Sequence, residues 1–137
     1  LLLDVVRERL GLTGVKRSCD VQVCGACTLL VDGRPVSACT TLAFEVRDRS
    51  VMTIEGLAEN GKLHPLQEAF IEHGGFQCGF CTPGMILAAK ALLDENPNPT
   101  EDQLKHFMHG NICRCTGYKK IIESIMAAAK VMREGRA

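Results

Sequence analysis

The sequence lacks a surplus of charge of either sign, a long apolar run and an export signal. Its 137 residues contain 16 Lys and Arg against 16 Asp and Glu, so the formal net charge at pH 7 is zero. Nucleic-acid-binding domains carry a basic surface, and this balance argues against nucleic acid as a partner. Asp4, Arg7 and Glu8 interrupt the N-terminal leucines, and no apolar stretch reaches the roughly 18 residues that a membrane span needs. We therefore expect no direct membrane insertion and a cytoplasmic protein, associated with a membrane only through partners.

Cysteine is the residue that the chain has in unusual number. Eight cysteines are present, fewer than in small secreted disulfide scaffolds of comparable length, and no export signal accompanies them. Disulfide bonds are therefore disfavoured. Ligation of metal ions or of metal clusters is the first hypothesis for these side chains.

The first four cysteines follow the spacing C-x4-C-x2-C with a later fourth, which is the plant-type 2Fe-2S arrangement. They are Cys19, Cys24, Cys27 and Cys39. A 2Fe-2S cluster needs four soft thiolates that converge from a loop, with backbone N–H groups left free to bond its sulfides. The small residues Gly25 and Ala26 permit the close approach of such a loop.

The other four cysteines form a second complete set, C-x2-C followed by C-x-C. They are Cys78, Cys81, Cys113 and Cys115. Each pair is predicted to run directly into a helix, at Thr82 and at Thr116, and helix N-termini favour an anionic cluster through exposed N–H groups and the macrodipole. Four thiolates can also hold zinc, so two structural zinc sites remain an alternative. Because both sets are filled by thiolates, the histidines are expected at helix ends or on the surface: His64, His73, His106 and His109.

The order of predicted elements is strands first and helices afterwards. Hydrophobic periodicity predicts a helix over 2–10, a hairpin of strands 28–31 and 35–38, and a strand over 51–54. Helices are predicted over 65–73, 82–95 and 101–109 and from about 116 to 133. Four helices with short connections favour a small bundle. The glycine-containing segment from Glu55 to Lys62 predicts a boundary, which gives domains 1–56 and 57–137.

Three motifs together closely resemble the iron–sulfur subunit of the xanthine dehydrogenase/aldehyde oxidase family of molybdenum hydroxylases. They are Cys19-Asp-Val-Gln-Val-Cys24-Gly-Ala-Cys27-Thr, Gln77-Cys78-Gly-Phe-Cys81-Thr-Pro-Gly-Met85 and Gly110-Asn-Ile-Cys113-Arg-Cys115-Thr-Gly-Tyr118. The resemblance implies an α+β fold, with an N-terminal β-grasp ferredoxin-like domain followed by a C-terminal four-helix bundle. It implies one 2Fe-2S cluster in each, bound by the two cysteine sets.

The resemblance also implies a role and partners. In this family electrons pass from a molybdenum site through the bundle cluster and the ferredoxin-like cluster to FAD. The implied partners are a large molybdopterin-binding subunit, with the cofactor in a dinucleotide form, and a medium FAD-binding subunit, in a dimer of heterotrimers. Gln77 and Cys115 match positions that hydrogen-bond the molybdopterin. The chain is then a separate electron-transfer subunit of an oxidoreductase, with no catalytic residues of its own.

Two differences from the family concern the first domain. Members commonly carry glycine before the first cysteine and two residues before the second, where this chain has Ser18 and Gln22. The family's first domain also opens with a strand hairpin of roughly 20 residues, without which a β-grasp sheet is short of strands. The chain starts at Leu1 without Met, and we expect that hairpin to be missing from this sequence.

Two other functional classes are distinguishable by experiment. A zinc-stabilised interaction module would be colourless and redox-silent. A free ferredoxin would purify without flavin and molybdenum subunits, and the second cysteine set argues against it.

Overall fold

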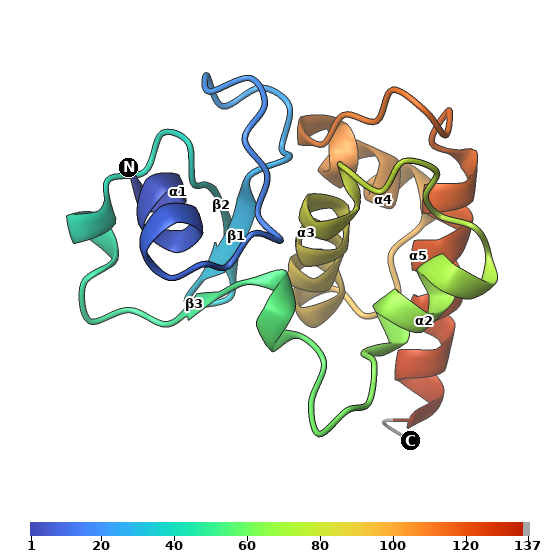
Figure 1. Ribbon diagram of the computed structural model, residues 1–137. Coiled ribbons are helices and arrows are strands. Elements are labelled where there is room, and N and C mark those ends of the chain that lie inside the picture. Colours follow the sequence, from blue (N-terminus) through green and yellow to red (C-terminus); the bar gives the residue numbers. More distant parts are fainter. Residues whose placement is uncertain (136–137) are drawn as a thin grey trace.

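A small sheet and a group of helices lie side by side in the computed structural model, which describes residues 1–135 (Figure 1). The first part contains α1 (Leu2–Asp4), continued by a π-helical segment (Val5–Arg9), then β1 (Thr28–Val31), β2 (Arg34–Ser37) and β3 (Val51–Met52). The second part contains α2 (Pro65–Glu72), α3 (Thr82–Glu95), α4 (Glu101–Phe107) and α5 (Lys119–Gly135). Short 3₁₀ turns span Ala43–Val46, Ile54–Gly56 and Met108–Gly110.

The sheet has the order β2-β1-β3, with β1 antiparallel to both neighbours. Asp32 and Gly33 form the predicted hairpin turn with φ values of 49° and 78°, as a two-residue turn between right-twisted strands requires. All four residues of β1 are buried because the sheet is covered on both faces. The N-terminal helix contributes Leu2, Leu3 and Val6 to this core, and α3 contributes Leu87 and Ala91.

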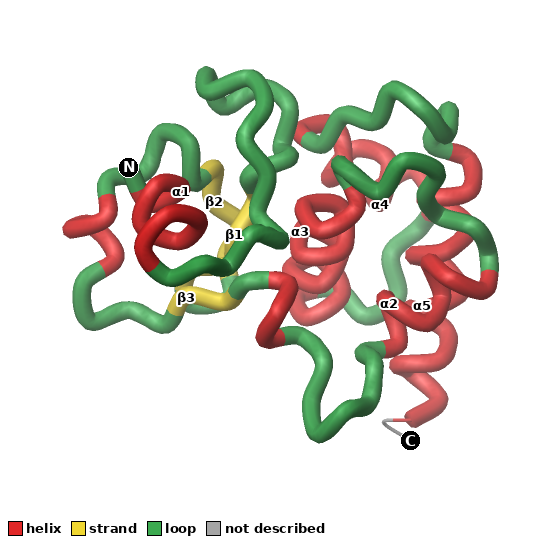
Figure 2. Tube along the Cα trace, in the orientation of Figure 1, coloured by secondary structure: helices red, strands yellow, loops and turns green. Residues whose placement is uncertain are grey.

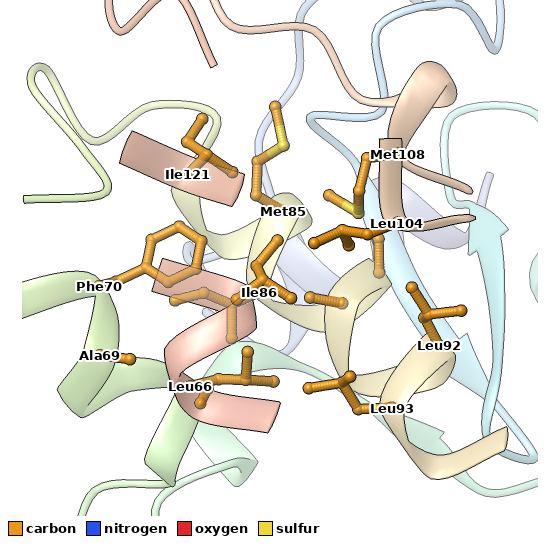
Figure 3. Close-up of a cluster of buried hydrophobic side chains, with 14 of the residues drawn as sticks. Leu66, Ala69, Phe70, Met85, Ile86, Leu92, Leu93, Leu104, Met108 and Ile121 are labelled. Atoms are coloured by element: carbon orange, nitrogen blue, oxygen red, sulfur yellow. The ribbon is translucent and has the colours of Figure 1, made fainter. Parts of the chain in front are cut away.

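The helical part has its own core, shown in Figure 3. Helix α2 provides Leu66 and Phe70, and the other helices provide Met85, Leu93, Leu104 and Ile121 among others. Local signals position the helices: Thr100 and Gln103 form a reciprocal capping box at the start of α4, and His64 caps α2, which begins at Pro65. A histidine at a helix end agrees with the sequence-based expectation.

Helix α3 belongs to both cores. Its residues Leu87 and Ala91 pack with the sheet, while Met85, Ala89 and Leu93 pack with the other helices. Figure 1 shows α3 between the strands and the remaining helices. The apolar side chains of α3 therefore join the sheet-containing part to the helical part of the chain.

Several predicted boundaries were wrong. Helix α5 starts at Lys119 instead of Thr116, because Gly117 and Tyr118 adopt φ values of 67° and 70°, which no right-handed helix admits. By contrast, α3 covers the predicted range, Thr82–Glu95, with Cys81 at its N-cap position. The last strand covers only Val51–Met52. Within residues 1–135 no helix combines the length and apolarity that crossing a membrane requires.

Candidate metal centres

All eight cysteines lie in loops or turns, not in helices or strands, and Cys39 is in the turn that follows β2 (Figure 2). We call Cys19, Cys24, Cys27 and Cys39 the first quartet, and Cys78, Cys81, Cys113 and Cys115 the second quartet. All eight cysteines are free thiols.

The first quartet is organised by a loop that turns its backbone amides toward one sulfur. The Cys19 Sγ accepts N–H groups from Val21 at 3.5 Å, Val23 at 3.4 Å and Cys24 at 3.4 Å. Asp20 and Gln22 make this possible by adopting left-handed φ values of 56° and 61°. Successive amides that point inward form an anion-binding concavity. Gln22, which stands where the family commonly has glycine, thus adopts a conformation that glycine favours.

The thiols of the first quartet differ in acidity. The three backbone N–H groups, that of Val21 first, lower the pKa of Cys19 to about 6, whereas burial raises the pKa of Cys27 to about 11. Cys27 also interacts with Cys39 and Cys24, so the thiols are close to one another. Metals bind the thiolate and displace its proton. Cys19 would therefore bind as a thiolate that is already present near neutral pH, whereas the buried Cys27 would have to release its proton if a metal bound it.

Two side-chain contacts hold the first loop in place. Arg17 forms ion pairs with Asp4 in α1 and with Asp20 in the loop. At the other end, the Ala38 N–H donates to the Cys27 carbonyl at 3.2 Å, which ties the two buried cysteines Cys27 and Cys39 to the hairpin. The loop is thereby fixed to the helix on one side and to the sheet on the other.

The second quartet is assembled from two segments that are distant in sequence. The Sγ atoms of Cys78 and Cys115 lie 3.4 Å apart, and Cys81 and Cys113 also interact through their thiols. The Cys113 Sγ accepts the Thr116 hydroxyl at 3.2 Å and the Thr116 N–H at 3.4 Å. Cys81 is at the N-terminus of α3 as predicted, whereas Cys113 and Cys115 precede a loop and not the start of a helix.

Acidity again varies within the quartet. Burial raises the pKa of Cys81 to about 12. Burial acts in the same direction on Cys113, but the hydrogen bonds from Thr116 outweigh it and lower the Cys113 pKa. The Phe80 N–H lowers the pKa of Cys78, and the hydrogen bond with Cys78 raises that of Cys115. Both quartets thus combine a stabilised thiolate with thiols that would have to lose a proton if they bound a metal.

The residues of both quartets fit a 2Fe-2S cluster. Each provides four soft thiol donors with N–H groups directed at sulfur, the donor chemistry that such clusters require. Within the described residues no three His, Cys, Asp or Glu side chains are arranged to hold a single metal ion. The thiols of the second quartet approach in pairs, Cys78 with Cys115 and Cys81 with Cys113. The buried Thr82 Oγ1 beside Cys81 has no hydrogen-bond partner, and a sulfur of a bound cluster would provide one.

The two residues predicted to contact molybdopterin lie near each other. Gln77 is exposed and directly precedes Cys78, whose sulfur contacts that of the exposed Cys115. The histidines take no part in either quartet. Sequence reasoning missed the role of two polar residues beside the second quartet. For Thr116 the available signal was a hydroxyl three residues after Cys113. Asn111 lies just beyond the helix predicted over 101–109, and no sequence signal distinguished it.

A direct contact joins the loops of the two quartets. The Ile112 N–H donates to the Cys24 carbonyl at 2.8 Å. In Figure 1 the blue loop between α1 and β1 and the orange loop between α4 and α5 lie next to each other at the top of the view. Cys24 and Cys113 are thus connected through one hydrogen bond and the backbone of Ile112.

Comparisons with known proteins agree with this geometry. Residues 2–71 match a family described as a 2Fe-2S iron–sulfur cluster binding domain, and residues 53–126 match one described as a 2Fe-2S binding domain. The nicotinate dehydrogenase small FeS subunit of Eubacterium barkeri is 51% identical over 94% of this chain and 82% of its own length.

A longer relative and a solved structure also match this chain. An aldehyde oxidoreductase of Megalodesulfovibrio gigas is 49% identical over 96% of this chain, which spans 15% of that protein. A chain in the crystal structure of quinoline 2-oxidoreductase from Pseudomonas putida 86 superposes with a TM-score of 0.93 and 47% identity, covering 99% of this chain and 85% of that one. The predicted α+β fold, ferredoxin-like and then helical, is confirmed. This chain belongs to the family of two-cluster 2Fe-2S iron–sulfur subunits of the xanthine dehydrogenase/aldehyde oxidase type.

Proposed function

We propose that this chain relays electrons between a molybdopterin site and FAD on partner subunits, with the first quartet ligating one 2Fe-2S cluster and the second quartet the other. Each cluster supplies reversible one-electron redox chemistry. The chain's own residues position the two clusters and stabilise their thiolates. Electrons enter at the second quartet, because Gln77 and Cys115 are the proposed molybdopterin contacts, and leave at the first.

The observation that carries this proposal is the junction between the quartets. The Ile112 N–H bonds the Cys24 carbonyl at 2.8 Å, and Ile112 is adjacent to Cys113. A continuous path of covalent bonds and one hydrogen bond thus leads from a ligand of one cluster to a ligand of the other. Two unrelated zinc sites would not need such a connection.

Exposed apolar side chains mark where the partners bind. Phe76, Phe80, Ile112 and Tyr118 surround the second quartet and are 42%, 46%, 45% and 42% exposed; we call them the second collar. Val21 and Val23, the first collar, lie between Cys19 and Cys24 and are 64% and 57% exposed. Apolar groups that gather on a surface mark interaction sites. The second collar faces the large molybdopterin-binding subunit, and the first collar faces the medium FAD-binding subunit.

The assembly is proposed as a dimer of heterotrimers in which residues 1–56 and 57–137 form the ferredoxin-like and helical units. In this proposal the eight cysteines of the chain are committed to ligation, and none of its residues converts substrate. Substrate chemistry then belongs to the large subunit.

Visible absorption and EPR of the anaerobically purified, dithionite-reduced complex, with iron and zinc measured on the same sample, test the proposal. We expect two distinct 2Fe-2S signals and about four iron atoms per chain. A protein that is loaded with zinc, colourless and EPR-silent even when purified anaerobically from iron-supplemented cells would overturn it. Co-purification with flavin and molybdenum subunits distinguishes the relay from a free ferredoxin.

A further inference from the structure

Asn111 is a buried polar side chain at the junction of the two cysteine loops. It is 8% exposed, and its side-chain amide donates to the Gly25 carbonyl at 3.2 Å and to the Thr28 Oγ1 at 3.3 Å. The Thr28 hydroxyl in turn donates to the same Gly25 carbonyl at 2.7 Å. The network closes on itself, and a buried network of this kind holds one geometry because breaking any bond leaves a buried group unpaired.

Gly25 is enclosed from two sides. A Cβ on Gly25 would lie 2.4 Å from the Gly110 carbonyl and 2.6 Å from the Asn111 Nδ2. On the other side, a Cβ on Gly84 of α3 would lie 2.4 Å from the Gly25 carbonyl. The Gly25 peptide therefore sits between α3 and Asn111 with no room for a side chain. Its position is determined by the helical part of the molecule.

The hydrogen bonds at this junction are the directional contacts between the sheet-containing part and the helical part of the chain. Apart from the linker around residue 56, the hydrogen bonds that join residues 1–56 to residues 57–135 all originate from Asn111 and Ile112. The remaining contacts are mainly apolar, chiefly the packing of α3 and Phe107 against the sheet, and hydrophobic burial is non-directional. Packing brings the two parts together, and the Asn111 network fixes how they are aligned.

We propose that Asn111 is a positioning residue that locks the two cysteine loops in one relative arrangement and so sets the spacing and the electronic coupling of the two clusters. Gly25 directly follows the ligand Cys24, and Asn111 lies two residues before the ligand Cys113. A change at Asn111 therefore moves the two sets of ligands relative to each other without removing a ligand. This inference rests on the proposed relay function.

Asn111→Leu in the complete complex is the first test, because leucine has a similar shape and no hydrogen-bond donor. With both clusters reduced, we expect a weaker EPR splitting from their magnetic interaction. We also expect the first cluster to be reduced more slowly after the molybdenum centre has been rapidly reduced. Each cluster keeps its own g values and iron content. Asn98→Leu, a matched change at an exposed asparagine, leaves both measurements unchanged.

Gly84→Ala tests the same junction from the opposite side. Alanine favours a helix over glycine, so a purely local effect on α3 would be stabilising, whereas the added methyl group displaces the Gly25 carbonyl and changes the splitting. If Asn111→Leu assembles no clusters, this variant decides the outcome. If the variants keep both clusters and show an unaltered EPR splitting and an unaltered rate of electron transfer, the inference about Asn111 is overturned. The proposed relay function is then unaffected. Absence of two cluster signals in the unmodified complex would overturn the relay itself.

Discussion

The two quartets reach similar donor sets by different routes. The first is built mainly from one continuous loop, Cys19 to Cys27, whose amides turn toward Cys19. The second needs two segments that lie more than thirty residues apart and meet where Cys78 contacts Cys115. Backbone N–H groups stabilise the thiolate in the first, and a side-chain hydroxyl, that of Thr116, contributes in the second. One site therefore depends on local conformation, and the other depends on helix packing.

Removing one ligand from each quartet has the largest expected effect. Cys24→Ser should abolish one cluster signal and stop electron delivery to flavin, while the molybdenum centre is still reduced by substrate. Cys113→Ser should abolish the EPR signal of the second cluster and prevent electrons from the molybdenum centre from entering the chain. EPR and rapid reduction kinetics measure both. Loss of both clusters in either variant would contradict two independently assembled sites.

Core truncation should separate the two sites by their dependence on packing. Phe70 is 1% exposed and lies beneath Gly75, where an added Cβ would be 2.7 Å from its ring, on the loop that leads to Cys78. Phe70→Ala should cost about 3–5 kcal/mol and bleach the second cluster first on heating. Leu29→Ala, in the fully buried β1, is the matched change for the first cluster. Simultaneous bleaching of both clusters in each variant would show that the sites unfold as one unit.

The collars should control different partners. Val23→Glu places a charge in the first collar and should release the FAD subunit, whereas Phe80→Glu in the second collar should release the molybdopterin subunit. A disrupted interface centre costs about 2 kcal/mol or more, roughly thirtyfold in affinity. Co-purification and size-exclusion chromatography measure the loss. Release of the same partner by both variants would refute the assignment of the surfaces.

Thr116→Val should shift one reduction potential selectively. It removes the hydroxyl that donates to the Cys113 Sγ at 3.2 Å and keeps the side-chain shape. Hydrogen bonds to cluster sulfurs raise the potential, and a bond worth about 1 kcal/mol corresponds to about 40 mV for one electron. The second cluster's midpoint should fall by this amount and the first should not change. Thr40→Val, which removes a hydroxyl bonded to Gln22 and not to sulfur, serves as the control in a redox titration.

The smallest expected effect is a pH dependence confined to the helical part. The neutral His64 Nδ1 accepts the Leu66 N–H at 3.2 Å, which an imidazolium cannot do. Burial, and then the nearby Lys90, lower the His64 pKa from 6.5, although Asp94, Glu59 and Glu68 act in the opposite direction. The unfolded chain therefore takes up the proton more readily. The cap's contribution is present above pH 6.5 and is lost as the pH falls through the folded-state pKa.

This loss should amount to about 1 kcal/mol, the usual value of an N-cap. Thermal bleaching of the second cluster, compared between pH about 7.5 and about 5.5, measures it. His64→Asn provides a cap that does not titrate and should reduce the pH dependence. An equal dependence in both proteins would exclude His64 as its source.

Much of the fold was accessible from the sequence because its signals are local. The hairpin turn at Asp32-Gly33, the capping box at Thr100 and the apolar stripes of α3 and α5 each arise from neighbours a few residues apart. The start of α5 was misplaced because Tyr118, a residue that rarely adopts positive φ, ends an extended loop instead of opening a helix. Its hydroxyl accepts the Cys113 N–H at 3.1 Å. This hydrogen bond offsets the energetic cost of the unusual conformation, and the hydrophobic periodicity of the sequence does not reveal it.

By itself, the sequence determined which eight side chains could act as ligands, how they divide into two sets and which chemistry the spacing of each set favours. It did so because thiolate ligands in one loop or at one helix start are constrained by a few intervening residues. Only the tertiary structure decided that Asn111 meets Gly25, 86 positions away in sequence, and that Ile112 bonds Cys24. Such contacts follow from the packing of α3 against both cores, because hydrophobic burial brings distant segments together and directional hydrogen bonds then fix their alignment.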